Sequence, residues 1–372
     1  PILARLPDAP PGTKGISLFA VPKHIVDADG RPETRNDVQC LSLERKMGCH
    51  LSPTCVMRFG ESGGAVGELI GEPHDGMRCM FTMMNQARLT VGLQGLAIAE
   101  RAYQDALAYA RERVQGRRGG RPAAIVEHAD VRRMLMTMKS QITAARGLMA
   151  TAGAALDASR RHADPELRAL MRGRVDLLTP IVKAWFTDLG VEVSSLAVQV
   201  HGGMGYVEDA RAAQHYRDAR ITPIYEGTNG IQALDLVGRK LSMADGELPW
   251  QLFGELRREL RSLERDADPT LTAPMRHALA NAEAATRWIQ GDHGQDGDAV
   301  PAGAAPYLRL MAQLLASFTL ARGARAAAGR PDAASRHALW AFHARRILPP
   351  AGALFDGVTA GSAALDLCFF EA

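Results

Sequence analysis

The feature that most constrains the fold is a seam of small residues that starts at Gly92 and recurs every three or four positions. Its members are Gly92, Gly95, Ala99, Ala102, Ala106 and Ala110. Residues at this spacing lie on one face of an α-helix, and small side chains there let a neighbouring helix approach closely. The seam therefore predicts a long helix packed tightly against its neighbours in a bundle.

Helical patterns continue beyond this seam. We expect a second helix from about Glu127 to Leu156. A third is expected to start at Asp164, with a proline in its first turn, and to end at Gly202-Gly203. Pro180 inside the third helix is expected to kink it or to leave a carbonyl free. A shorter fourth helix, from near Thr228 to Leu241, completes an up-and-down bundle.

The residues on either side of this bundle have different patterns. Before residue 76, short alternating runs near 15–22, 38–43 and 54–59 predict strands of an antiparallel sheet or barrel. After residue 241, apolar periodicity from Leu252 onward predicts a further helical unit, with helices near 271–290, 304–328 and 333–346. The predicted fold is mostly α with a partial antiparallel β domain. We expect part of a β domain over 1–76, a four-helix bundle over 77–241 and an additional helical domain over 242–372.

Composition excludes several classes of protein. The chain has 372 residues, of which 47% are hydrophobic and 23% charged, so it is neither disordered nor fibrous. Its 44 Lys and Arg against 41 Asp and Glu give a net charge of +3, which argues against a nucleic-acid partner. The sequence contains no run of 18 apolar residues, so it predicts no transmembrane helix.

The five cysteines are Cys40, Cys49, Cys55, Cys79 and Cys368. An odd number in a large chain argues against a disulfide framework, and the absence of a C-x-x-C pair argues against zinc, so no metal is expected. These cysteines favour a reduced, cytoplasmic protein.

Chemistry-bearing residues are densest between Gln199 and Gln232. Gly202 and Gly203 end a helix and expose backbone groups, and such a turn or a helix N-terminus suits a phosphate or another anionic group. Glu226, next to apolar Ile224 and Tyr225, suits a general base. On the residues alone an ordinary structural interpretation is favoured, in which the glycines cap a helix and Glu226 complements a helix dipole.

Two long motifs in this stretch resemble those of the acyl-CoA dehydrogenase family. The first, Q-x-x-G-G-x-G, runs from Gln199 to Gly205, and the second, R-D-x-x-x-x-x-I-Y-E-G-T, runs from Arg217 to Thr228. Asn85-Gln86-Ala87-Arg88 and the segment 111–116 are also similar to the family. The β segments match its middle domain. The added helical unit resembles a larger subfamily, although the N-terminal helical domain of the family is lacking.

The resemblance implies an FAD-dependent dehydrogenase that converts an acyl-CoA to the trans-2-enoyl-CoA. Glu226 would remove the α-proton, and its backbone amide would polarise the thioester carbonyl. Arg88 would lie on the substrate side, and Thr228 would contact the flavin of its own subunit. The residues implied to reach the flavin of a neighbouring subunit are Arg113, Gln115, Gln199, Gly202 and Gly203. A homodimer or a dimer of dimers and an electron-transfer flavoprotein as acceptor are implied as well.

Two positions depart from the family pattern: Gly230 stands where many relatives have Gln, and His201 stands where an aromatic residue is frequent. Each departure affects an individual contact to the flavin that the resemblance implies, and neither changes the implied reaction class. Because the first strands of the family's β domain are lacking too, we expect these residues to be part of a longer polypeptide. Alone, they are expected to bind flavin poorly and to show no activity.

Two other functions fit the same residues. Five arginines between Arg111 and Arg121 are consistent with a flavoprotein-like DNA-binding module, for which a steep salt dependence of DNA binding would be diagnostic. An inactive helical scaffold of the same fold is the other alternative. The intact run Tyr225-Glu226-Gly227-Thr228 argues against it.

Overall fold

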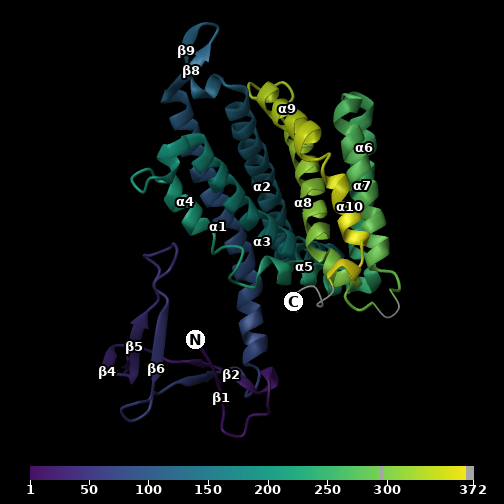
Figure 1. Ribbon diagram of the computed structural model, residues 1–372. Coiled ribbons are helices and arrows are strands. Elements are labelled where there is room, and N and C mark those ends of the chain that lie inside the picture. The colour runs from purple at the N-terminus through teal and green to yellow at the C-terminus, as the bar shows by residue number, and fades with distance from the viewer. Residues whose placement is uncertain (294–295, 366–372) are drawn as a thin grey trace. The chain divides into compact units, whose positions relative to one another are not determined.

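The computed structural model describes residues 1–293 and 296–365 (Figure 1). By its packing the chain divides into two compact units, residues 1–87 and the residues from Arg88 onward. Cys368 lies outside the described residues. The domain limits at 76 and 241 remain predictions.

The first unit consists of short antiparallel strands. β1 (Ile2–Arg5), β2 (Ile16–Ala20) and β7 (Glu68–Ile70) form a three-stranded sheet in the order β1-β2-β7. β3 (His24–Val26) pairs with β4 (Pro32–Arg35), and β5 (Val38–Leu43) pairs with β6 (Cys55–Phe59). In the three-stranded sheet Leu18 lies opposite both Leu3 and Ile70. The three strands expected from alternation are therefore confirmed.

The second unit contains the predicted bundle. Its helices are α1 (Gly76–Glu112, which begins in the first unit), α2 (Ala129–Arg161), α3 (Pro165–His201), α4 (Ala212–Ala219) and α5 (Asn229–Gly238). α1, α2 and α3 alternate in direction, as Figure 1 shows. The Asp164 carboxylate accepts a hydrogen bond from the Glu166 amide at 2.9 Å and starts α3, and Gly202, with φ +60°, ends it. Pro180 is buried within α3, which continues through it.

The small-residue seam lies inside the bundle, as predicted. Ala99, Ala102, Ala106 and Ala110 have no exposed surface. A Cβ added to Gly95 would lie 2.5 Å from the Phe186 carbonyl oxygen on α3. No other residue allows this approach of α1 to α3 without displacing one backbone.

Five helices follow α5: α6 (Leu248–Asp266), α7 (Pro269–Ile289), α8 (Ala299–Ala326), α9 (Ala333–Phe342) and α10 (Ala351–Thr359). α8 packs against α2, α5, α7, α9 and α10, and is buried along most of its length. A buried polar row joins it to α2 and to the turn after α9. In this row the Gln313 amide donates to Gln141 Oε1 at 3.1 Å, and His343 Nε2 lies 3.2 Å from Gln313 Oε1.

One element differs from the sequence prediction. Over 114–124, where the sequence predicts no strand, the chain forms a hairpin of β8 (Val114–Arg118) and β9 (Arg121–Ala124). Its two-residue turn is Gly119-Gly120, with φ of +56° and +80°. A glycine pair with positive φ is typical of a tight hairpin turn, so Gly119-Gly120 was the sequence signal for this hairpin.

Within residues 1–293 and 296–365, none of the helices combines the length and the apolar composition that a membrane crossing requires.

Candidate active site

Glu226 lies in the loop between α4 and α5 with a backbone conformation that non-glycine residues rarely adopt. Its φ is +57°, and φ of the following Gly227 is +84°. Such a conformation costs on the order of 1 kcal/mol for a non-glycine residue, so the surrounding structure must hold it. Thr228 then begins α5, because its hydroxyl accepts a hydrogen bond from the Ile231 amide at 3.3 Å.

Buried polar side chains hold this loop. The Gln232 amide group donates to the Glu226 carbonyl at 3.3 Å, and Lys183 Nζ donates to the Gly227 carbonyl at 2.8 Å. The Asn229 backbone amide donates to the Pro223 carbonyl at 2.9 Å, which closes the loop on itself. The loop is therefore tied to α3 and α5 at several points.

Arg88 lies beside the same loop. The residue is 6% exposed, and Nη1 is 3.8 Å from Asp235 Oδ2 on α5. A Cβ added to Gly227 would lie 3.9 Å from Arg88 Nη2. The structure thus brings Arg88 and the Glu226 loop together from positions far apart in the sequence, as the predicted substrate-side role requires.

The charges around the loop affect one another. Burial lowers the pKa of Lys183 to about 8, while the carboxylates of Asp188 and Glu226 oppose this shift and Arg88 adds to it. Burial also raises the pKa of Asp188, although its hydrogen bond from Asn229 opposes the change.

The backbone amides of Glu226 and Gly227 face no acceptor in the part of the chain that the structure describes. Two such donors beside a carboxylate can bind a carbonyl oxygen or an anionic group.

A second group of predicted site residues lies at the other end of α1. The rings of Tyr109 on α1 and His201 on α3 stack with centroids 4.5 Å apart, and His201 Nδ1 lies 2.7 Å from the Ala197 carbonyl. His201 is therefore a packing residue that joins these two helix ends. The exposed members of this group are Arg113, Gln115, Gln199, Gly202 and Gly203.

The two groups are far apart within one chain. Arg113 follows Arg88 by 25 residues along α1, and a helix rises about 1.5 Å per residue, so about 37 Å separate them. The structure therefore brings Arg88, Glu226 and Thr228 together, and separately Arg113, Gln199, Gly202 and Gly203. It does not bring the two groups to one place in a single chain.

Arginines of the β8–β9 hairpin form an ion pair and a hydrogen bond within the chain. Arg121 forms an ion pair with Glu127 at 2.6 Å, and Arg118 donates to the Glu127 carbonyl. These bonds leave a smaller free basic surface than the sequence suggests for a DNA-binding module.

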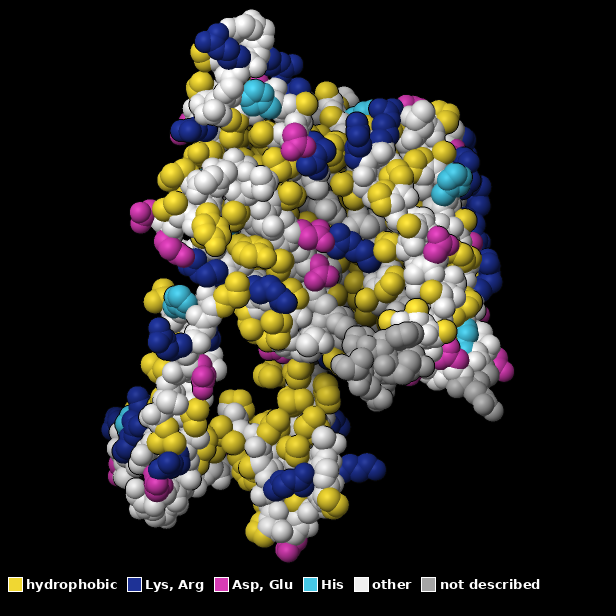
Figure 2. All heavy atoms as spheres, in the orientation of Figure 1, with side chains coloured by type: hydrophobic (Ala, Val, Ile, Leu, Met, Phe, Trp, Pro, Cys, Tyr) yellow, Lys and Arg dark blue, Asp and Glu magenta, His cyan; other side chains and the backbone are white. Residues whose placement is uncertain are grey.

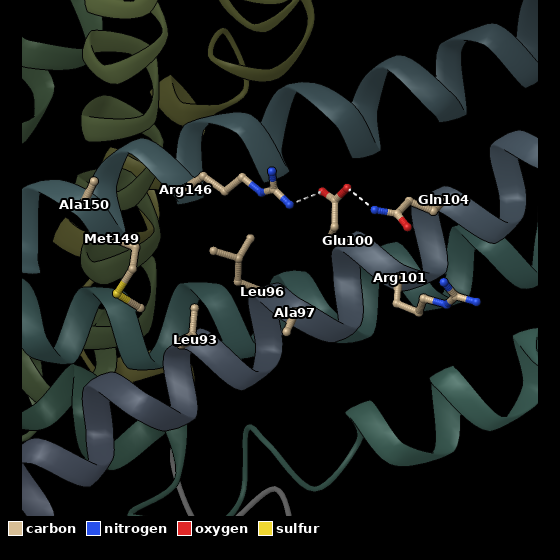
Figure 3. A pocket seen from close by; sticks show the side chains of 9 residues that line it. All are labelled: Leu93, Leu96, Ala97, Glu100, Arg101, Gln104, Arg146, Met149 and Ala150. Carbon is tan, nitrogen blue, oxygen red and sulfur yellow. Dashed lines mark hydrogen bonds and ion pairs between the residues drawn. The ribbon is translucent and has the colours of Figure 1, made fainter.

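A separate groove lies between α1 and α2 (Figure 3). It encloses about 580 Å³, its apolar side chains include Leu93, Leu96 and Met149, and Glu100 at its edge binds Arg146 at 3.2 Å. Glu226 is not among its lining residues.

Sequence reasoning missed three side chains of the site: Lys183, Asn229 and Gln232. For Lys183 a signal existed, because it is the single charged residue within the mainly apolar run from Leu177 to Phe186. A lysine there is rarely buried without a specific partner. Asn229 and Gln232 carried no comparable signal, since polar residues are ordinary in a first helical turn.

Models of two protein families match the chain. "Acyl-CoA dehydrogenase, C-terminal domain" matches residues 74–241, and "Acetyl-CoA dehydrogenase C-terminal like" matches residues 252–367. The second match covers the additional helices, in agreement with the predicted subfamily.

Curated relatives agree with these matches. The chain is 44% identical over 336 residues to 3-methylmercaptopropionyl-CoA dehydrogenase of Ruegeria pomeroyi, which covers 88% of this chain and 56% of that protein. It is 40% identical to a butyryl-CoA dehydrogenase of Syntrophomonas wolfei, over 66% of this chain and 42% of the relative. The chain thus spans about half the length of the curated relatives it matches.

Solved structures share the fold. ACDH-11 of Caenorhabditis elegans, solved in complex with C11-CoA, superposes with a TM-score of 0.76 at 21% identity, over 93% of this chain and 56% of that one. An acyl-CoA dehydrogenase of Bacillus anthracis complexed with FAD gives a TM-score of 0.71 at 20% identity, over 92% and 60%.

Proposed function

Because the chain belongs to the acyl-CoA dehydrogenase family, we propose that it carries the catalytic base of an enzyme that oxidises an acyl-CoA to the trans-2-enoyl-CoA. The observation that carries this proposal is the Glu226 loop. It presents a carboxylate and two backbone amides without acceptors, next to a buried arginine.

Glu226 has two roles in this reaction. Its carboxylate takes the α-proton of the thioester and holds that proton on a carboxylate oxygen. Its backbone N–H donates to the thioester carbonyl, on which negative charge develops as the α-proton leaves. Both groups belong to one residue, so the backbone conformation of Glu226 sets the position of the base and of the carbonyl donor together.

Arg88 supplies positive charge on the substrate side. Asp235 on α5, 3.8 Å away, orients its guanidinium, and burial keeps the pair away from bulk water. A cation in such a site stabilises developing negative charge more strongly than it would in water.

The exposed residues of the chain fit FAD. The guanidinium of Arg113 is exposed and suits a diphosphate, which arginine binds in a bidentate manner. A Cβ at Gly202 or Gly203 would meet nothing within 4 Å, so this turn is open to a ligand. Gln115 and Gln199 would add polar contacts beside them, and Thr228 would contact the cofactor from the base side. When bound, the flavin accepts the β-hydrogen as hydride.

The separation of the two groups supports a site built from two subunits. Along α1 the two groups lie about 37 Å apart, which favours a site that takes one group from each of two chains. In a homodimer, Arg113, Gln115, Gln199, Gly202 and Gly203 would serve the flavin next to the partner's base.

Exposed hydrophobic side chains also support an assembly, which we propose to be a homodimer or a dimer of dimers. Figure 2 shows hydrophobic side chains among the charged ones on the helical unit. Near the two groups they are Met204, Tyr206, Val207, Ile221, Ile224, Ile231 and Leu234. Such apolar surface is typical of a protein interface.

We further propose an electron-transfer flavoprotein as the electron acceptor, as the family resemblance implies. The thiols of Cys40, Cys49, Cys55 and Cys79 are not in disulfides, which suits a reducing compartment such as the cytoplasm.

The proposal is tested by Glu226→Gln in the natural full-length protein. This change keeps the shape of the side chain and removes the base, so we expect dehydrogenation to fall by at least about 10³-fold, within the range of general-base effects. Flavin content and acyl-CoA affinity should change little. Both are measured on the same preparation, by absorbance and by calorimetric titration.

Glu208→Gln is the matched control. Glu208 is exposed, lies outside the Glu226 loop and forms an ion pair with Arg217 at 2.6 Å, so its loss should leave the rate within about twofold. A Glu226→Gln variant that turns over acyl-CoA at the wild-type rate would refute the assignment of the base.

A further inference from the structure

A buried lysine lies against the loop that carries Glu226. Lys183 on α3 has no exposed surface, and its Nζ donates to the Gly227 carbonyl at 2.8 Å and to Asn229 Oδ1 at 2.9 Å. Among the described residues, Lys183 forms no ion pair with a carboxylate within 4.0 Å. Lys240, the other buried lysine of the bundle region, is paired directly with Asp176.

An ammonium group inside a protein is unfavourable unless hydrogen bonds satisfy it. Both acceptors of Lys183 lie within residues 227–229, so its bonds act on this one segment. Hydrogen bonds from a charged donor are stronger than neutral ones, which makes Lys183 an effective tie for the loop.

Asn229 extends this tie back to α3. Its side-chain nitrogen donates to Asp188 Oδ1 at 2.7 Å and to the Ala184 carbonyl at 3.1 Å. Its oxygen meanwhile accepts from Lys183. The amide group of Asn229 is thus bonded at both ends, and the loop is fixed to two successive turns of α3.

The hydrogen bonds to residues 227–229 affect the position of Glu226 through the backbone. Glu226 and Gly227 are consecutive residues with positive φ, a conformation that the loop would leave if its carbonyls were released. With the Gly227 carbonyl held by Lys183 and the Glu226 carbonyl held by Gln232, the peptide units that follow Glu226 are fixed.

We propose that Lys183 is a positioning residue which, together with Asn229, clamps the Gly227 segment and thereby sets the direction of the Glu226 carboxylate and amide. This inference rests on the proposed role of Glu226 as the base. Among the described residues Lys183 forms no ion pair with the Glu226 carboxylate, and it acts through the backbone of the loop.

The test replaces Lys183 by Met, which has a similar length but neither charge nor donors. In the natural flavin-loaded protein we expect amide hydrogen exchange over residues 223–232 to become at least about tenfold faster, since opening the loop becomes easier. We expect kcat to fall by about ten- to a hundredfold, as small misplacements of a catalytic group do, with KM for acyl-CoA within about threefold. Lys240→Met is the matched control and should change neither quantity.

The double variant Lys183→Met with Glu226→Gln separates positioning from general damage. If Lys183 acts only through Glu226, adding Lys183→Met to Glu226→Gln should lower the rate by less than about twofold, because effects of residues that act as a unit do not add. A further tenfold loss in the double variant would overturn the proposal. Asn229→Ala, which removes one of the two acceptors, tests the same clamp if Lys183→Met does not fold.

Unchanged exchange over residues 223–232 in the folded variants would overturn the clamp, whatever the activity. So would faster exchange with an unaltered kcat, or equal effects of Lys183→Met and Lys240→Met. If the wild-type protein shows no dehydrogenation while Lys183→Met loosens the loop, the role of Glu226 fails and the clamp itself stands.

Discussion

At the scale of single residues, the candidate site combines a proposed base that the sequence indicates and a proposed positioning lysine that it does not. Glu226 stands in a long motif, so its role can be predicted from the residues around it. Lys183 lies 43 positions earlier in the sequence. Its proposed role follows only from its hydrogen bonds to the Gly227 carbonyl and to Asn229 Oδ1. Local sequence patterns cannot show these hydrogen bonds, because they depend on how α3 packs against the loop.

Lys183 should make the stability of the protein depend on pH. Burial lowers its pKa from 10.5 to about 8 in the folded protein. Between these values the unfolded chain binds more protons than the folded one, so stability rises with pH over this window. Asp188, Arg88 and Glu226 are the charged groups that act on it, and Arg88 is itself paired with Asp235.

We therefore expect the wild type to gain on the order of 3 kcal/mol in unfolding free energy, relative to Lys183→Met, between about pH 8 and 10.5. Urea unfolding of both proteins across this range measures the difference. A constant difference would mean that Lys183 is not a buried, charged group at neutral pH.

At the scale of elements, helices with strong periodicity and marked ends could be predicted, and short or turn-dependent elements could not. Asp164 and Gly202 mark the two ends of α3 in the sequence as they do in the structure. α4 has only eight residues and its periodicity is too short to recognise, while the β8–β9 hairpin depends on the Gly119-Gly120 turn. The meeting of Arg88 with the Glu226 loop follows from packing across the whole bundle.

The close approach of α1 and α3 gives a test at this scale. Gly95→Ala places a Cβ 2.5 Å from the Phe186 carbonyl oxygen, so a helix must shift, and we expect a loss of about 1–3 kcal/mol in stability. Gly153→Ala on α2 is the control. A Cβ there meets nothing within 4 Å, and the change should stabilise the helix by up to about 1 kcal/mol.

Urea unfolding followed by circular dichroism measures the free energy of unfolding of both variants. Equal stability of Gly95→Ala and Gly153→Ala would show that α1 and α3 are not packed as closely as the structure has them.

At the scale of the whole molecule, the two groups of site residues lie about 37 Å apart along α1. In the two-fold dimer proposed above, each site would take Glu226 from one chain and Arg113 from the other. The motifs and the family resemblance predict which residues take part and that they divide between two subunits. How far apart the two groups lie in one chain follows from the length of α1, which only the structure gives.

Mixed dimers test this arrangement. Glu226→Gln and Arg113→Ala chains are each expected to be defective alone, the second by weak flavin retention. Random pairing of the two variants should restore about a quarter of the wild-type activity, because half of the dimers are mixed and each mixed dimer has one intact site. Activity no higher than the sum of the separate variants would place Arg113 and Glu226 in the same chain's site.

The central claim is that Glu226 removes the α-proton, and a single-turnover measurement tests it most directly. The natural flavin-loaded protein is mixed with acyl-CoA without oxygen or acceptor, and the loss of flavin absorbance is followed over time. We expect rapid bleaching in the wild type and in Glu208→Gln, and at least about 10³-fold slower bleaching in Glu226→Gln, although acyl-CoA still binds. Bleaching of Glu226→Gln at the wild-type rate would contradict the account.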